Sequence, residues 1–117
     1  MSAAVAAINV DCADPSSLAS FWARLLGADV VVETPDYCAV QAGGLFLGAV
    51  RVEGYQPPTG PSFGGSRQMH LDVTVDDLDA SEREALALGA TKEERQPNPE
   101  RHRVLRDPAG HPFCIRA

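Results

Sequence analysis

The sequence has few of the features that commonly point to a function. Lys and Arg number 10 against 16 Asp and Glu, so the net charge at pH 7 is −6. Because nucleic-acid phosphates repel an acidic protein, the composition argues against a nucleic-acid partner. No apolar run approaches the roughly 20 residues needed to span a bilayer, and residues 1–7 lack the basic start of a signal peptide. We therefore expect no membrane partner and a cytoplasmic location.

Cysteine is also scarce. The three cysteines, Cys12, Cys38 and Cys114, are an odd number and show no C-x-x-C spacing. Neither a disulfide framework nor a zinc knuckle is therefore expected. The default interpretation of each is a small buried hydrophobe, and no catalytic motif supports Cys114 as a nucleophile.

The sequence does contain an internal repeat. Residues 68–75 alternate apolar and polar side chains, which predicts a β-strand, and residues 8–12 repeat that pattern. Two residue pairs are separated by 61 positions (70 − 9 and 72 − 11): Asn9 with His70, and Asp11 with Asp72. The tripeptide Leu-Gly-Ala at 26–28 also recurs at 88–90. The spacing predicts two halves that arose by duplication.

Each half is expected to form a strand, a helix and three further strands. In the first half we predict strands at 4–12, 28–34, 37–41 and 45–52, and a helix that Asp14 caps and Gly27 ends. In the second half we predict strands at 68–75, 91–96, 103–106 and 112–116, and a helix at 78–88 capped by Asp76 or Asp77. The strand at 45–52 is apolar on both faces, which predicts a central position, and Gly48 within it indicates a bulge or a close approach.

Several motifs together carry a resemblance to a known family. They are Asp11–Pro15 leading into Phe21-Trp22 and Leu25–Gly27, His70–Asp72 with Val75–Leu78, Leu88–Ala90, and Asp107–Cys114. In their order and spacing the chain resembles the vicinal oxygen chelate superfamily of glyoxalases, bleomycin-resistance proteins and extradiol dioxygenases. The resemblance covers nearly the whole chain and is closest to the small glyoxalase-like members.

The resemblance implies an α+β fold. Two βαβββ modules would form a half-open β-barrel around a central cavity, within a single glyoxalase-like domain. Module 1 would span about residues 4–52, a Pro- and Gly-rich linker residues 53–67, and module 2 about residues 68–117.

The resemblance also implies where a metal would bind. Family enzymes hold a divalent ion with His, Glu or Gln from the first and last strands of both modules. The matching positions here are Asn9, Gly48, His70 and Cys114. Only His70 matches the usual ligands, and a His-plus-Cys pair would hold zinc only with further partners such as Asp11 or Asp72. We therefore expect no metal and no cofactor.

Five residues are predicted to line the ligand-binding cavity: Asn9, Asp11, His70, Asp72 and Cys114. His70 would either form part of a hydrogen-bonded cavity wall, contact the ligand directly, or act as a general base. The two aspartates would either be acid/base groups or form buried hydrogen bonds between the modules. No residue is singled out as catalytic.

Three functions are compatible with these observations. The first is a glyoxalase-like protein that binds a small organic molecule in the cavity between its modules, as a homodimer and without a complete metal site. The alternative is a metal-dependent lyase, isomerase or dioxygenase of the same superfamily that uses His70. A third is a module that serves mainly in assembly. Whether the protein is an enzyme stays open, because fold does not settle function.

Overall fold

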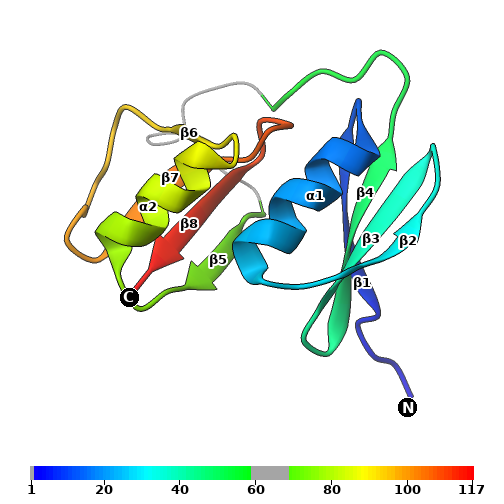
Figure 1. Ribbon diagram of the computed structural model, residues 1–117, viewed down its shortest axis with the longest axis horizontal. Helices are drawn as coiled ribbons and strands as arrows, with labels where there is room; N and C mark the ends of the chain where they lie inside the picture. Colours follow the sequence, from blue (N-terminus) through cyan, green and yellow to red (C-terminus); the bar gives the residue numbers. More distant parts are fainter. Residues whose placement is uncertain (1, 59–68) are drawn as a thin grey trace. The chain divides into compact units, whose positions relative to one another are not determined.

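The computed structural model describes residues 2–58 and 69–117 (Figure 1). The chain divides into two compact units, residues 1–56 and 57–117, which we call module 1 and module 2 from here on. Residues 59–67 of the predicted linker and Gln68 of the predicted strand lie outside the described residues. No helix in the described part of the chain is long and apolar enough to cross a membrane.

Module 1 follows the predicted order of one strand, one helix and three strands. Its elements are β1 (Ala7–Cys12), α1 (Pro15–Leu26), β2 (Val30–Glu33), β3 (Tyr37–Ala42) and β4 (Leu45–Arg51). The sheet has the order β1-β4-β3-β2, with β1 parallel to β4 and the other neighbours antiparallel. The central position of β4 is confirmed, and its two-sided burial explains why its sequence shows no alternation.

Module 2 repeats this topology. Its elements are β5 (Leu71–Thr74), α2 (Leu78–Ala87), β6 (Thr91–Lys92), β7 (His102–Arg106) and β8 (Pro112–Arg116). The sheet has the order β5-β8-β7-β6, and β5 runs parallel to β8. The predicted α+β class with two βαβββ modules is therefore confirmed, and in both modules the first strand pairs with the last.

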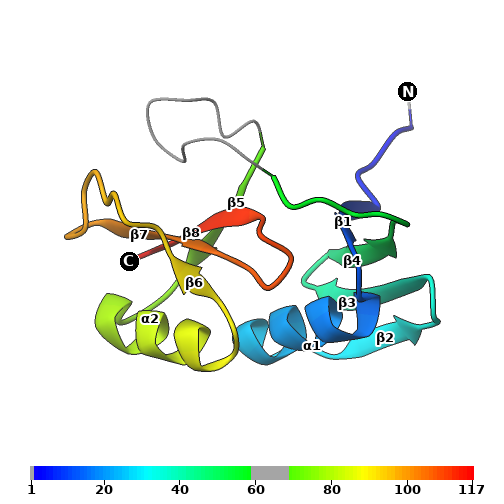
Figure 2. The same cartoon turned by 90° about the horizontal axis from the view of Figure 1, so that it is seen from above.

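Helix α1 begins and ends as its sequence predicts. The Asp14 side chain accepts a hydrogen bond of 3.2 Å from the Ser17 amide, and Gly27 ends the helix in the left-handed conformation with φ 62°. The apolar face of the helix is buried against β3 and β4 (Figure 2): Leu18, Ala19, Phe21, Trp22 and Ala23. In contrast, α2 is capped by Asp77 and buries only Ala85, as its thinner apolar face predicts.

The strand predicted at 91–96 is much shorter, because a side chain takes over its pairing. Regular pairing with β7 stops at Lys92. The Gln96 amide group then donates to the Val104 carbonyl oxygen and accepts from the Val104 N–H, each at 2.8 Å. Gln96 thus satisfies backbone groups of β7 without continuing the strand.

The structure corrects the match between the two modules. The helix caps Asp14 and Asp77 are 63 residues apart (77 − 14), not 61. In the parallel pairs Asn9 lies opposite Gly48, and Asp72 lies opposite Cys114. The equivalent of Asp72 is therefore Asn9, and the residue of β1 equivalent to His70 is Ala7. The spacing of 61 residues came from matching similar side chains in the two halves. The register of the strands and the start of each helix determine which residues are structurally equivalent.

Gly48 lies at a close approach, as predicted. The Tyr37 hydroxyl donates a hydrogen bond of 3.1 Å to Asn9 Oδ1, directly over Gly48. A Cβ atom at position 48 would meet Asn9 Oδ1 and would lie 2.6 Å from the Tyr37 hydroxyl oxygen and 2.8 Å from the Tyr37 ring. Only glycine fits beneath this pair of side chains.

We expect Gly48→Ala to lower the free energy of unfolding by about 1–2 kcal/mol, because the new methyl group must displace Tyr37 and Asn9. Urea denaturation would measure the change. Gly44→Ala is the matched control, since a Cβ there meets nothing within 4 Å. In a background that carries both Asn9→Ala and Tyr37→Ala most of the cost should disappear, because both contacting side chains are removed. Equal losses in Gly48→Ala and Gly44→Ala would contradict this account.

We expect Gln96→Ala to lower the free energy of unfolding by about 1–3 kcal/mol, because it leaves the N–H of the fully buried Val104 without its amide partner. The control is Gln41→Ala, whose side chain donates only to the carbonyl of Gly43 in an exposed turn. Thermal or urea unfolding of both variants would test the difference. A Gln96→Ala protein as stable as Gln41→Ala would show that water replaces the amide.

Candidate functional site

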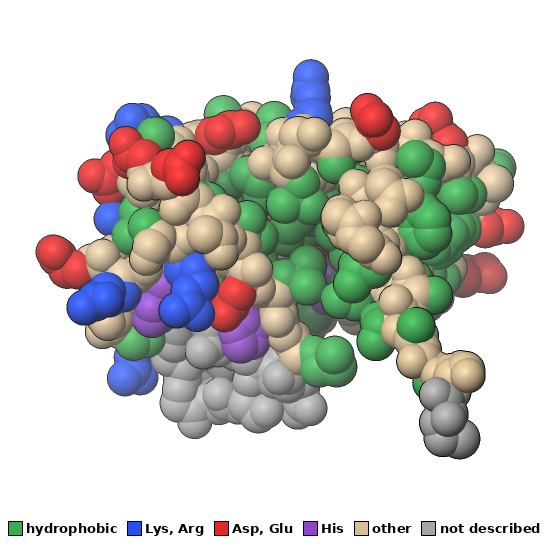
Figure 3. Space-filling view, turned by 90° about the horizontal axis from the view of Figure 1, so that it is seen from below, with side chains coloured by type: hydrophobic (Ala, Val, Ile, Leu, Met, Phe, Trp, Pro, Cys, Tyr) green, Lys and Arg blue, Asp and Glu red, His purple; other side chains and the backbone are tan. Residues whose placement is uncertain are grey.

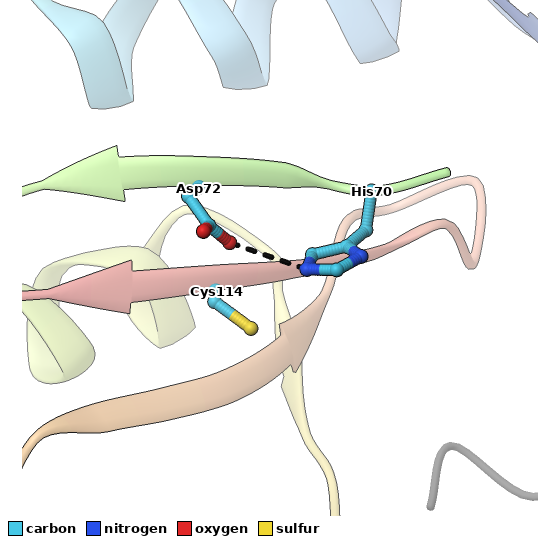
Figure 4. A group of neighbouring side chains, drawn as sticks. All are labelled: His70, Asp72 and Cys114. Carbon is cyan, nitrogen blue, oxygen red and sulfur yellow. Dashed lines mark ion pairs between the residues drawn. The ribbon is translucent and has the colours of Figure 1, made fainter. Parts of the chain in front are cut away.

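Three chemically active side chains meet on one face of the module 2 sheet. Asp72 of β5 lies opposite Cys114 of β8, so both side chains project from the same face of the sheet. His70 precedes β5 and is two residues before Asp72, which places it on that face as well. Figure 4 shows the three side chains turned toward one another. The parallel pairing of β5 with β8 therefore builds the cluster.

Asp72 lies close to two basic side chains. His70 Nε2 lies 3.3 Å from Asp72 Oδ1, and Arg116 Nη1 lies 3.6 Å from Asp72 Oδ2. The side chains of His70 and Asp72 are 27% and 45% exposed, whereas Cys114 is only 4% exposed. One ligand atom from each of His70, Asp72 and Cys114 lies within 4.8 Å of the other two. A polar pair thus stands beside a buried thiol.

This cluster forms one wall of a pocket of about 550 Å³. That volume falls within the range of roughly 300–1,000 Å³ found for small-molecule sites. The pocket is lined, within module 2, by residues that include His70, Asp72, Arg101, His102, Cys114 and Arg116. On the face shown in Figure 3, histidine side chains lie among arginine and acidic side chains. The lining is therefore polar and charged, above a buried sulfur atom.

The structure separates the five predicted site residues into two groups. It brings His70, Asp72 and Cys114 together in module 2. Asn9 lies in β1 of module 1, where its Oδ1 accepts the Tyr37 hydrogen bond, and Asp11 lies in the same strand. Asp11 and Asp72 are both exposed within their own modules. Their alternative roles, acid/base groups or buried hydrogen bonds between the modules, stay predictions.

Two arginines of the pocket, Arg101 and Arg116, were not predicted from the sequence. The alternation in β8 held the signal for Arg116, because it places this residue on the face of Cys114. Arg101 lies in the loop before β7, where no periodicity applies. His102 lines the pocket, whereas the guanidinium of Arg103 bonds to Asp79 and Glu82. These carboxylates, chiefly through the Asp79 hydrogen bond, raise the pKa of Arg103 above its ordinary value.

The donor set fits a metal ion only in part. It supplies one imidazole nitrogen, one carboxylate oxygen and one thiol sulfur. Mg²⁺ and Mn²⁺ favour several oxygen ligands, so this set suits a softer ion such as zinc. In module 1 the equivalents of His70 and Cys114 are Ala7 and Gly48, which carry no ligand atom, and the equivalent of Asp72 is Asn9, whose Oδ1 accepts the Tyr37 hydrogen bond. Asp72 also has Arg116 as a partner, so the three donors form an incomplete shell.

Comparison with solved structures shows related folds. A glyoxalase/bleomycin resistance protein/dioxygenase family enzyme from Burkholderia phytofirmans is 20% identical, with a TM-score of 0.74 and 97% of each chain covered. The fosfomycin resistance protein FosX from Mesorhizobium loti is 16% identical, with a TM-score of 0.71 and coverage of 99% of this chain and 92% of that one. At such identities the likeness shows the fold alone.

A bleomycin-binding protein from Streptomyces verticillus, solved with copper(II)-bleomycin, is 20% identical with a TM-score of 0.61, and the match covers 100% of this chain and 98% of that one. No curated protein sequence matches the chain. The family model of the glyoxalase-like domain matches residues 7–116. The family predicted from the motifs is therefore confirmed: the chain belongs to the glyoxalase-like domain family and has the glyoxalase/bleomycin-resistance fold.

Proposed function

We propose that this protein binds a small organic molecule in the pocket of module 2, without a complete metal site. The observation that carries the proposal is the pocket of about 550 Å³ on whose wall His70, Asp72 and Cys114 converge. Two structures of the same fold, a bleomycin-binding protein and a fosfomycin resistance protein, are named for organic antibiotics. The cavity that the family resemblance implies between the modules stays a prediction.

The His70–Asp72 contact leaves part of the imidazole ring for a ligand. His70 Nε2 lies 3.3 Å from Asp72 Oδ1, so Nδ1 is the ring nitrogen that has no partner in the cluster. A ligand hydroxyl or amide would thus find a hydrogen-bonding nitrogen on His70, while the buried Cys114 offers a soft, weakly polar contact.

We expect protein purified without added metal to contain far less than one metal ion per chain, because the three donors leave the coordination shell incomplete. Elemental analysis by mass spectrometry would measure this. The matched variants are His70→Ala, within the cluster, and His111→Ala, outside the pocket. Near-stoichiometric zinc, iron or manganese that is lost in His70→Ala and kept in His111→Ala would contradict the metal-free proposal.

That contrary result would favour the second candidate, a metal-dependent lyase, isomerase or dioxygenase. The convergence of three ligand atoms within 4.8 Å is the observation in its favour. His70, Asp72 and Cys114 would then hold the ion, which would supply Lewis-acid chemistry to a bound substrate.

We expect compounds that enter the pocket to raise the melting temperature by mass action. A ligand at ten times its Kd stabilises a protein by about 1.4 kcal/mol, which corresponds to roughly 5 °C for a chain of this length. A thermal-shift screen of metabolites and aromatic antibiotics would detect it. The shift should vanish in His102→Ala, which removes a lining side chain, and persist in His111→Ala. Shifts that survive His102→Ala would place the ligand elsewhere.

A further inference from the structure

We infer that the ligand of this pocket carries an oxyanion group, a carboxylate, phosphonate or phosphate, which binds between Arg101 and Arg116. The inference rests on the proposed function, because it names the chemical class of ligand for the same pocket. It follows from the charges of the lining side chains, from the ion pairs that each arginine does or does not make, and from a comparison with module 1.

The charge of the lining opposes that of the whole protein. The chain has a net charge of −6. Among the charged side chains of the lining, however, two guanidinium groups, Arg101 and Arg116, face one carboxylate, Asp72, and the imidazoles of His70 and His102 are beside them. The charged side chains of the lining thus carry one more positive than negative charge, and an excess of one sign in a concave site favours ligands of the opposite sign. The pocket therefore attracts anions to an otherwise acidic molecule.

Both arginines are available to a ligand. Among the described residues, five ion pairs engage four arginines, Arg51, Arg103, Arg106 and Arg116, and none of these pairs engages Arg101. The Arg116 pair with Asp72 is long, at 3.6 Å, and the Arg116 side chain is 61% exposed. Such a pair contributes little to stability and yields readily to a better-placed oxyanion. Arginine also binds carboxylate and phosphate oxygens in a bidentate manner.

The backbone holds Arg101 close to the strand that carries Arg116. The amides of Arg101 and His102 both donate to the Asn98 carbonyl oxygen, at 3.0 and 3.1 Å, which fixes a tight turn before β7. His102 then pairs with Arg116 across β7 and β8. Arg101 and Arg116 therefore line one pocket from neighbouring backbone positions.

Module 1 shows that the fold itself does not require these arginines. Tyr37 pairs with Val50 in β3 and β4, as His102 pairs with Arg116 in β7 and β8. Val50 therefore occupies the position of Arg116, and Asp36 the position of Arg101. The Tyr37 side chain also extends over Gly48, the equivalent of Cys114. The same topology forms with an aspartate, a valine and a tyrosine, so the cationic lining belongs to module 2 alone.

Three small probes test the inference on the full chain: benzoate, phenylphosphonate and benzamide. Benzamide has nearly the shape of benzoate but no charge. Titrations followed by amide chemical shifts should show the two anions perturbing residues 98–102 and 114–117 saturably, in the millimolar range expected for such small molecules. Benzamide should bind at least about tenfold more weakly than benzoate. The preferred anion distinguishes a carboxylate ligand from a phosphonate or phosphate ligand.

Substitutions assign the effect to the two arginines. Arg101→Met and Arg116→Met keep the length of the side chain and remove its charge, and each should weaken anion binding by about tenfold. Arg101→Lys should retain part of the affinity, because lysine keeps the charge without the bidentate geometry. Arg51→Met, which removes an exposed arginine of module 1 with an ion pair to Asp36, should have no effect. Dispersed amide spectra would verify that each variant folds.

Different outcomes separate this inference from the proposed function. Equal binding of benzamide and benzoate at residues 98–102 and 114–117 would overturn the anion inference but support small-molecule binding. Unchanged anion affinity in both methionine variants would also overturn it. Inorganic phosphate that binds as tightly as phenylphosphonate would contradict an organic anion, because the organic group would then contribute nothing. If no anion caused a saturable change in the amide chemical shifts, the inference would be overturned. The thermal-shift screen would still test the proposed function.

Discussion

The pairing of each module's first strand with its last is the interaction on which the site depends. Because β5 and β8 are parallel and adjacent, residues more than 40 positions apart in the chain come to lie on one face of the sheet. Asp72 and Cys114 owe their proximity to this register, and Arg116 follows on the same strand. A shift of one residue would turn every one of these side chains to the opposite face.

The two modules show how one topology can support different interiors. In module 1 the corresponding corner is filled by the hydrogen-bonded pair of Tyr37 and Asn9 above Gly48. In module 2 the corner contains His70, Asp72 and Cys114 and opens into a pocket. The sheets pair in the same order, so the difference comes from a few side chains. The side chains that could bind a ligand therefore differ between modules whose strand order is the same.

The sequence predicts most of the fold because its local signals agree with one another. The Asp14 cap, the apolar face of α1 and the Gly27 terminus all appear where their chemistry places them. Prediction fails where a side chain acts in place of the backbone, as Gln96 does beyond β6. It also fails where side-chain identity suggests the wrong equivalence, as with Asn9 and His70. The homodimer, the location in the cell and the lack of a nucleic-acid partner stay predictions, because none is encoded in one chain's geometry.

The candidate site was predictable only in part, for a related reason. His70, Asp72 and Cys114 lie in or beside strands, where alternation assigns each residue to a face. Arg101 lies in a loop, and its position depends on the turn that the Asn98 carbonyl organises. Pro97-Asn98-Pro99 indicates a break in the chain there, but a turn signal does not assign the next side chains to a face. The lack of space above Gly48 has a consequence for how this protein can change. A carboxylate side chain at that position would meet both Asn9 and Tyr37. A route to a metal centre in module 1 therefore has to rearrange two neighbouring side chains as well as replace the glycine.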